Sequence, residues 1–170
     1  LFFYNQSKYG GPGDFIMGPN NQLYGLSVNN HTNYQLDTTY LYTLNTNTDQ
    51  VQFLSTLPGT GSMSQFIAAS SDQKIYISSI QYTSTDNITR ILEYDIQNQQ
   101  TSILHISVNY PMMTEFIVTE DNSKLIGYCL TSETTSGLCS FSLDTDQISL
   151  IQPISNTTYP NKLIRGTAGT

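Results

Sequence analysis

The repeated pattern of this protein begins with Gly13-Asp14-Phe15-Ile16 and Leu23-Tyr24-Gly25, two short apolar segments separated by a polar turn. Later versions are Ser64-Gln65-Phe66-Ile67 with Ile75-Tyr76-Ile77, Thr114-Glu115-Phe116-Ile117 with Leu125-Ile126-Gly127, and a fourth start at Asn161-Lys162-Leu163-Ile164. The anchors Phe15, Phe66, Phe116 and Leu163 therefore recur about every 50 residues, a period typical of repeat architectures.

Each repeat contains a second pair of apolar segments that alternate as strands do. In the first repeat, Tyr40-Leu41-Tyr42-Thr43-Leu44 leads through polar residues into Val51-Gln52-Phe53-Leu54, and residues 91–106 and 138–151 follow the same plan. Alternation with a period of two belongs to strands, and polar clusters such as Glu120-Asp121-Asn122 form turns between them. We predict an all-β fold of tandem four-stranded antiparallel blades, with repeats near 11–60, 61–110 and 111–158 and partial blades at 1–10 and 159–170.

The segments Tyr42-Thr43-Leu44-Asn45-Thr46-Asn47-Thr48 and Phe141-Ser142-Leu143-Asp144-Thr145 resemble the hairpin between the third and fourth strands of β-propeller blades. The resemblance is at superfamily level, covers nearly the whole chain and implies an architecture, with nothing implied about ligand or activity. The chain has no Trp, so the WD-type and kelch-type signatures are not matched. Two alternatives stay open, namely a β-sandwich with accidental self-similarity and blades in an open stack.

The repeat pattern leaves both of its ends unfinished. Leu1-Phe2-Phe3-Tyr4 aligns with the fourth strand of a preceding unit, and Leu163 to Gly166 align with the first strand of a following unit. Three complete blades are fewer than a closed propeller needs. We therefore expect other copies of the chain, or further blades of a longer parent protein, to act as partners. A four-bladed ring with an incomplete last blade is the third explanation.

The composition argues against nucleic acid and membrane partners. Only 11% of residues are charged, the net charge is −7, and the six basic residues are scattered along the sequence. Nucleic acid binding requires clustered basic side chains, and no apolar run approaches the length of a membrane span. Asn, Gln, Ser and Thr supply the polarity instead, while 38% hydrophobic residues in periodic runs favour a packed fold over disorder.

Two features predict an extracellular location. Sequons for N-linked glycans occur at Asn5, Asn30, Asn87 and Asn156, in segments expected to be loops at related places of the repeats. Cys129 and Cys139 flank a polar turn, and a cross-strand disulfide there is the preferred interpretation, with two buried free thiols as the alternative. Glycans and disulfides both belong to secreted or cell-surface proteins.

No group of residues is marked out for catalysis or for a cofactor. His31 lies in a polar loop, and His105 lies on a predicted strand where we expect it to face outward. Glu93 and Asp95 are interpreted as a solvated face, and Asp144-Thr145-Asp146 as a hairpin turn. Two cysteines alone cannot complete a metal site. We expect no catalytic residues, no metal and no cofactor.

The sequence favours a secreted, N-glycosylated structural or adhesive repeat protein that assembles into a larger extracellular array or fibre. Low charge, abundant hydroxyl and amide side chains, the sequons and the unfinished ends support this hypothesis. The alternatives are a ligand-binding propeller module, for instance one that binds carbohydrate through its 12 Tyr side chains, and a fragment of a propeller enzyme.

Overall fold

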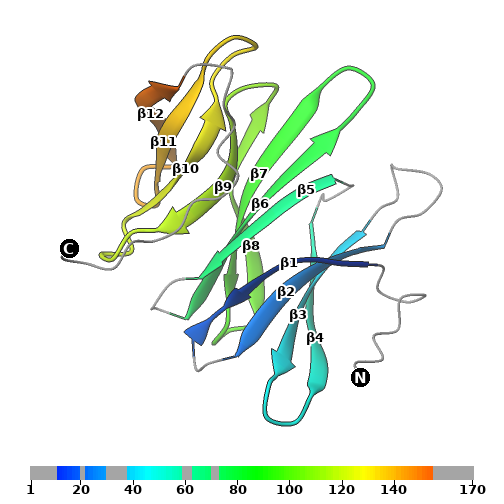
Figure 1. Ribbon diagram of the computed structural model, residues 1–170. Helices are drawn as coiled ribbons and strands as arrows, with labels where there is room; N and C mark the ends of the chain where they lie inside the picture. Colours follow the sequence, from blue (N-terminus) through cyan, green and yellow to red (C-terminus); the bar gives the residue numbers. More distant parts are fainter. Residues whose placement is uncertain (1–10, 20–21, 30–37, 59–62, 70–72, 155–170) are drawn as a thin grey trace.

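The computed structural model (Figure 1) describes residues 11–19, 22–29, 38–58, 63–69 and 73–154. These residues form strands β1 to β12, which are arranged in three antiparallel sheets of four strands each. Within every sheet the strands follow one another in chain order, so each sheet is a meander. The predicted class of all-β, four-stranded blades is confirmed. The partial blades at 1–10 and 159–170 lie outside the described residues.

The three sheets are here named blades 1, 2 and 3. Blade 1 contains β1 (Gly11–Met17), β2 (Leu23–Asn29), β3 (Thr38–Asn45) and β4 (Gln50–Leu57). Blade 2 contains β5 (Met63–Ala69), β6 (Lys74–Tyr82), β7 (Asn87–Asp95) and β8 (Gln100–Val108). Blade 3 contains β9 (Met112–Val118), β10 (Lys124–Leu130), β11 (Ser136–Ser142) and β12 (Gln147–Ile154).

The turn between the third and fourth strands has the same backbone shape in every blade. Its last residue lies in the left-handed region, with φ of 54° at Asp49, 56° at Gln99 and 55° at Asp146. Asp tolerates this conformation better than most residues do, which suits it to the position. The repeat found in the sequence is therefore also a repeat of backbone conformation.

The blades lie side by side, with β5 between β1 and β9 (Figure 1). We call the face that a blade turns toward the blade before it the preceding face, and the opposite face the following face. One core cluster joins Tyr24, Leu26 and Leu41 of blade 1 to the preceding face of blade 2, which supplies Ile75, Ile77, Leu92 and Tyr94. The hydrophobic core is thus formed between sheets, and burial of both faces stabilises blade 2.

A second core cluster joins blade 2 to blade 3. Tyr76 and Ile91 on the following face of blade 2 pack against the preceding face of blade 3. That face supplies Met113, Phe116, Val118, Leu125, Cys129, Cys139 and Phe141. The two clusters show that neighbouring blades join in the same way at both junctions.

The strand registers define which residues of the blades are equivalent. Gly25, Ile77 and Gly127 correspond in the second strand, Tyr42, Leu92 and Cys139 in the third, and Phe53, Ile103 and Leu150 in the fourth. Each pairing of third and fourth strands contains one irregularity, at the same place in all three blades.

The first hairpin of blade 2 differs from the other two. Phe15 pairs with Gly25 and Phe116 with Gly127, but Phe66 pairs with Ser78, one position away from Ile77. Blades 1 and 3 have a bulge in this hairpin, and blade 2 has none. The predicted equivalence of Phe66 with the other two anchors is wrong by one residue.

Candidate interaction surface

The disulfide lies at the junction between blades 2 and 3. Cys129 of β10 and Cys139 of β11 are joined with their Cα atoms 5.8 Å apart, in agreement with the sequence prediction. Both residues are fully buried in the cluster that contains Tyr76 and Ile91 of blade 2. The cross-link therefore ties together the two central strands of blade 3 directly beneath a neighbouring blade.

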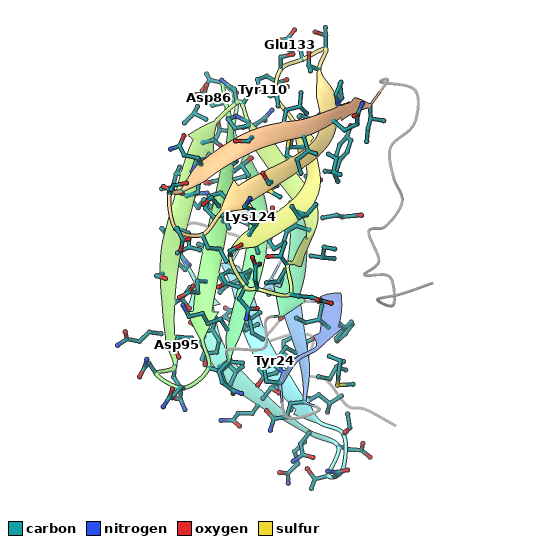
Figure 2. The ribbon with its side chains drawn as sticks, turned by 90° about the vertical axis from the view of Figure 1, so that its left-hand side faces the viewer. Tyr24, Asp86, Asp95, Tyr110, Lys124 and Glu133 are labelled. Atoms are coloured by element: carbon teal, nitrogen blue, oxygen red, sulfur yellow. A yellow bond between two sulfur atoms is a disulfide. The ribbon has the colours of Figure 1, made fainter. Side chains whose placement is uncertain are left out.

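Of the four predicted glycan sites, only Asn87 lies within the described residues. It begins β7 instead of lying in the preceding loop, and it is partly exposed. Its backbone N–H donates to Oδ1 of Asn109 at 3.0 Å, and its carbonyl accepts from the N–H of Asn109. Figure 2 shows the adjacent Asp86 at the same end of the sheets as Tyr110 and Glu133, opposite Asp95. Asn5, Asn30 and Asn156 lie outside the described residues, as does His31.

His105 is packed between two blades and does not face outward as predicted. Its Nδ1 lies 3.1 Å from Oδ1 of Asp146, in the turn between β11 and β12 of blade 3. Its ring meets the Phe141 ring edge-on, with centroids 5.6 Å apart. The partner of His105 comes from the next repeat, which the local sequence does not reveal. The pair joins β8 of blade 2 to the turn between β11 and β12 of blade 3.

The corresponding contact between blades 1 and 2 is neutral. Oγ of Ser55 in β4 lies 3.0 Å from Oγ1 of Thr101 in β8. Ser55 pairs with Leu41 as His105 pairs with Ile91, so Ser55 and His105 occupy equivalent places in their blades. Both junctions therefore have a side-chain contact at this position. It is a pair of hydroxyls between blades 1 and 2 and a His–Asp pair between blades 2 and 3.

Of Glu93 and Asp95, which the sequence indicated as a solvated face, Asp95 is solvated and Glu93 is not. Glu93 is mostly buried and accepts a hydrogen bond from Nζ of Lys74 at 3.1 Å. Asp95 instead holds the turn after β7, where the backbone N–H and side-chain amide of Asn98 donate to its carboxylate and lower its pKa. Asp144 and Asp146 lie in a hairpin turn, as predicted.

The described part of the chain meets neither of two simple requirements for other kinds of site. No three His, Cys, Asp or Glu side chains gather in this part of the chain as a metal site would need. Nor does it contain a helix long and apolar enough to span a membrane.

The preceding face of blade 1 carries exposed apolar side chains. Phe15 is 44% exposed and Met17 is 58% exposed, whereas their equivalents in blade 3, Phe116 and Val118, are 6% and 4% exposed. Val51 and Phe53 of β4 are exposed on the same face. Phe116 and Val118 are less exposed than Phe15 and Met17 because blade 2 covers the preceding face of blade 3.

Aromatic rings give this open face its shape. Phe15 and Tyr42 meet edge-on with centroids 6.1 Å apart, and Tyr40 and Phe53 do so at 5.9 Å. The Tyr42 ring covers Gly25, where a Cβ atom would lie 2.6 Å from the ring. The exposed rings of Phe15 and Phe53, each in contact with a Tyr ring, provide an apolar surface of the kind that interaction sites use. Sequence reasoning identified these residues as strand residues and missed the surface that they form.

Comparisons with known proteins concern the fold. No protein-family model matches the sequence, and no curated protein matches it. Among solved structures, TolB from Acinetobacter baumannii matches with a TM-score of 0.58 and 13% identity over 82% of this chain and 32% of that one. The fold is that of a partial β-propeller.

Two further matches support this partial propeller. The β-propeller domain of the Trilobed protease from Pyrococcus furiosus has a TM-score of 0.54 and 10% identity, over 88% of this chain and 44% of that one. The acylaminoacyl peptidase from Pyrococcus horikoshii has a TM-score of 0.55 and 8% identity, over 89% and 26%. The present chain thus spans less than half the length of each matched chain. At such identities the likeness shows fold alone.

Proposed function

We propose that this chain is an extracellular, N-glycosylated structural or adhesive protein whose propeller blades associate into a larger array. The observation that carries the proposal is the exposure of apolar side chains on the preceding face of blade 1. Phe15 and Met17 are exposed there, although the equivalent residues of blade 3 are buried against a neighbouring blade. An apolar face of this kind is stabilised by covering it with another protein surface.

Two features support the compartment in this proposal. The disulfide between Cys129 and Cys139 is typical of proteins that fold under oxidising conditions. The sequons at Asn5, Asn30, Asn87 and Asn156 would carry N-linked glycans in the secretory pathway. Secretion from a eukaryotic host followed by glycosidase treatment tests this part, because each occupied site lowers the apparent mass on removal. An unchanged mass would contradict the glycoprotein assignment.

The structural role is tested by the mass and shape of the chain in solution. We expect light scattering to give a mass of several copies, and negative-stain microscopy to show rings or filaments. A particle with the mass of one chain, 19.0 kDa before glycans, would contradict the structural role. The Met17→Glu variant provides the control, because its equivalent Val118 is buried at a junction, so a charge at Met17 should prevent association while leaving the fold intact.

A second candidate function is a binding or accessory module within a propeller enzyme. Two matched structures favour it, since one is the propeller domain of a protease and the other an acylaminoacyl peptidase. A ligand-binding module, for instance for carbohydrate, would present aromatic rings as the open face of blade 1 does. A monomeric particle that binds a glycan in a screen, and loses that binding in Phe53→Glu, would favour this alternative.

A further inference from the structure

We propose that Arg90 binds the carboxylate of a fatty acid, whose alkyl tail lies along the exposed apolar side chains of β8. The site lies on the preceding face of blade 2, at the junction with blade 1. It needs no association between copies of the chain, so it is independent of the proposed structural role. Two observations carry it, a guanidinium without a partner and an exposed apolar strip beside it.

The strand registers place Arg90 on the preceding face of blade 2. Arg90 lies two residues before Leu92 in β7, and Leu92 packs into the cluster between blades 1 and 2. Residues two apart in a strand point to the same face. Arg90 pairs with Ser79 of β6 on one side and with Ile106 of β8 on the other. Ser79, Arg90 and Ile106 therefore form one row across this face.

The guanidinium of Arg90 has no partner among the described residues. Its Nη1 atom is buried and makes no hydrogen bond, and Oγ of the neighbouring Ser79 is buried and unpaired as well. No ion pair joins Arg90 to another described residue. Burial lowers the pKa of Arg90, while the side chain as a whole is partly exposed and can be reached by a ligand. A desolvated cation without a partner is unfavourable, so an anion that reaches it is bound favourably.

The described acids near Arg90 in the sequence point away from it. Glu93 and Asp95 belong to the same strand but lie on its opposite face, because each is an odd number of residues away from Arg90. Glu93 is paired there with Lys74. The described residues that blade 1 contributes to the cluster at this junction are uncharged. Neither β7 nor that cluster therefore supplies a carboxylate to Arg90.

An exposed apolar strip on β8 runs past Arg90. Ile106, which pairs with Arg90, is 54% exposed, and Val108 two residues further along is 55% exposed. Ile103 pairs with Leu92 in the other direction and is 42% exposed. A cation beside exposed apolar side chains matches an anion that carries an alkyl tail. The carboxylate meets the guanidinium fork, and the tail covers apolar surface.

The equivalent row of blade 3 has a different composition. In blade 3 the row that corresponds to Ser79, Arg90 and Ile106 consists of Cys129, Gly137 and Pro153. This row carries no charge, and its cysteine belongs to the disulfide. A junction between blades therefore does not require a cation at this position, which favours a binding role for the one in blade 2.

Titration calorimetry with sodium octanoate tests the site, with octanol and acetate as probes for the tail and the carboxylate alone. We expect octanoate to bind more tightly than either. Arg90→Gln should weaken octanoate binding at least about tenfold, because it removes the charge that the carboxylate meets. Lys124→Gln is the matched control, since it removes an exposed cation of blade 3 and should leave the binding unchanged. Ile106→Asn should weaken octanoate binding and leave acetate binding unchanged.

Several results of this titration would overturn the inference. Failure of wild type to bind octanoate would remove the site. Octanol binding as tightly as octanoate would show that the carboxylate is not recognised, and acetate doing so would show that the tail contributes nothing. Equal losses in Arg90→Gln and Lys124→Gln would show that binding follows net charge and not this position.

The stability of Arg90→Met provides a second test, which needs no assumption about affinity. Met keeps an unbranched side chain and removes the charge, so it should raise the melting temperature of the ligand-free protein by about 2–4 °C. Octanoate should raise the melting temperature of wild type and not that of the variant, because a ligand that binds only the folded state stabilises it. A lower melting temperature for ligand-free Arg90→Met would show that the chain itself supplies a partner for the guanidinium, and would overturn the inference.

Discussion

Blade 1 and blade 3 have nearly the same preceding face and opposite environments. Phe15 and Phe116 pair with equivalent glycines, and Met17 and Val118 end equivalent strands. Yet the residues of blade 1 are exposed and those of blade 3 are buried. The two blades differ in exposure on their first strands and not on their fourth. Leu150 of β12 is exposed, and so is its equivalent in blade 1, Phe53. Covering by a neighbouring blade, and not the composition of the face, decides burial.

The comparison also shows how a repeat protein is stabilised. Each sheet has two apolar faces and can bury neither alone, so stability comes largely from the junctions between units. Blade 2 has both faces covered, and its two clusters hold the buried residues of three sheets together. The same substitution should therefore have different consequences at equivalent positions of different blades.

The largest expected difference is between Phe116→Ala and Phe15→Ala. Removing the buried ring of Phe116 leaves a cavity between blades 2 and 3, and should lower the free energy of unfolding by about 3–5 kcal/mol. Removing the exposed ring of Phe15 should lower it by less than about 1 kcal/mol in the monomer. Urea unfolding followed by circular dichroism measures both. Equal losses would show that the face of blade 1 is already covered.

A second difference in unfolding free energy is expected for substitutions of Gly25 and Gly127, the glycines that pair with Phe15 and Phe116. A Cβ at Gly127 would lie 2.6 Å from the carbonyl oxygen of Glu115, so the backbone of β9 must move. At Gly25 the clash is with the outer atoms of the Tyr42 ring, the far end of a side chain that shifts more easily than backbone does. Gly127→Ala should therefore cost about 1–3 kcal/mol of unfolding free energy, and Gly25→Ala clearly less. A reversed order in urea unfolding would contradict this account.

The strands and their repeat could be predicted from the sequence because both depend on local pattern. Alternation gave the strands, and turn residues such as Asp49 and Asp146 take the same backbone conformation in different blades. The cysteines could be paired because they lie on adjacent strands of one hairpin. These features need only short-range information.

The rest of the site depends on contacts between strands and between repeats, which local pattern does not contain. The partner of His105 lies in the next blade, and the predicted solvated role of Glu93 failed because Lys74 pairs with it across two strands. Phe66 was misaligned by one residue because the adjacent apolar residues Phe66 and Ile67 do not show in the sequence which of them pairs with Ile77. The exposure of this face of blade 1 could not be recognised, since its residues are as apolar as those of the buried face of blade 3.

A smaller effect is expected where the two junctions differ in chemistry. His105 and Asp146 join blades 2 and 3, whereas Ser55 and Thr101 join blades 1 and 2. A double-mutant cycle of His105→Gln and Asp146→Asn should give a coupling of about 0.5 kcal/mol, because Asp146 is half-exposed and solvent weakens the pair. High salt should reduce this coupling and leave that of Ser55→Ala with Thr101→Val unchanged. Salt-independent coupling at His105 would show that ring packing on Phe141 carries the contact.

The smallest effect concerns the turn before β10 in blade 3. The hydroxyls of Thr119 and Ser123 and the backbone N–H of Ser123 donate to Asp121, and these hydrogen bonds lower its pKa to about 2. Because the folded-state pKa is depressed, the carboxylate stabilises the turn above the ordinary pKa of an aspartate, and this contribution is lost as the pH falls toward 2. Carbon-detected NMR titration should give an Asp121 midpoint near 2 in wild type and a higher one in Thr119→Val, which lacks the hydroxyl that lowers this pKa most. An unchanged midpoint in Thr119→Val would show that the turn does not hold the carboxylate as described.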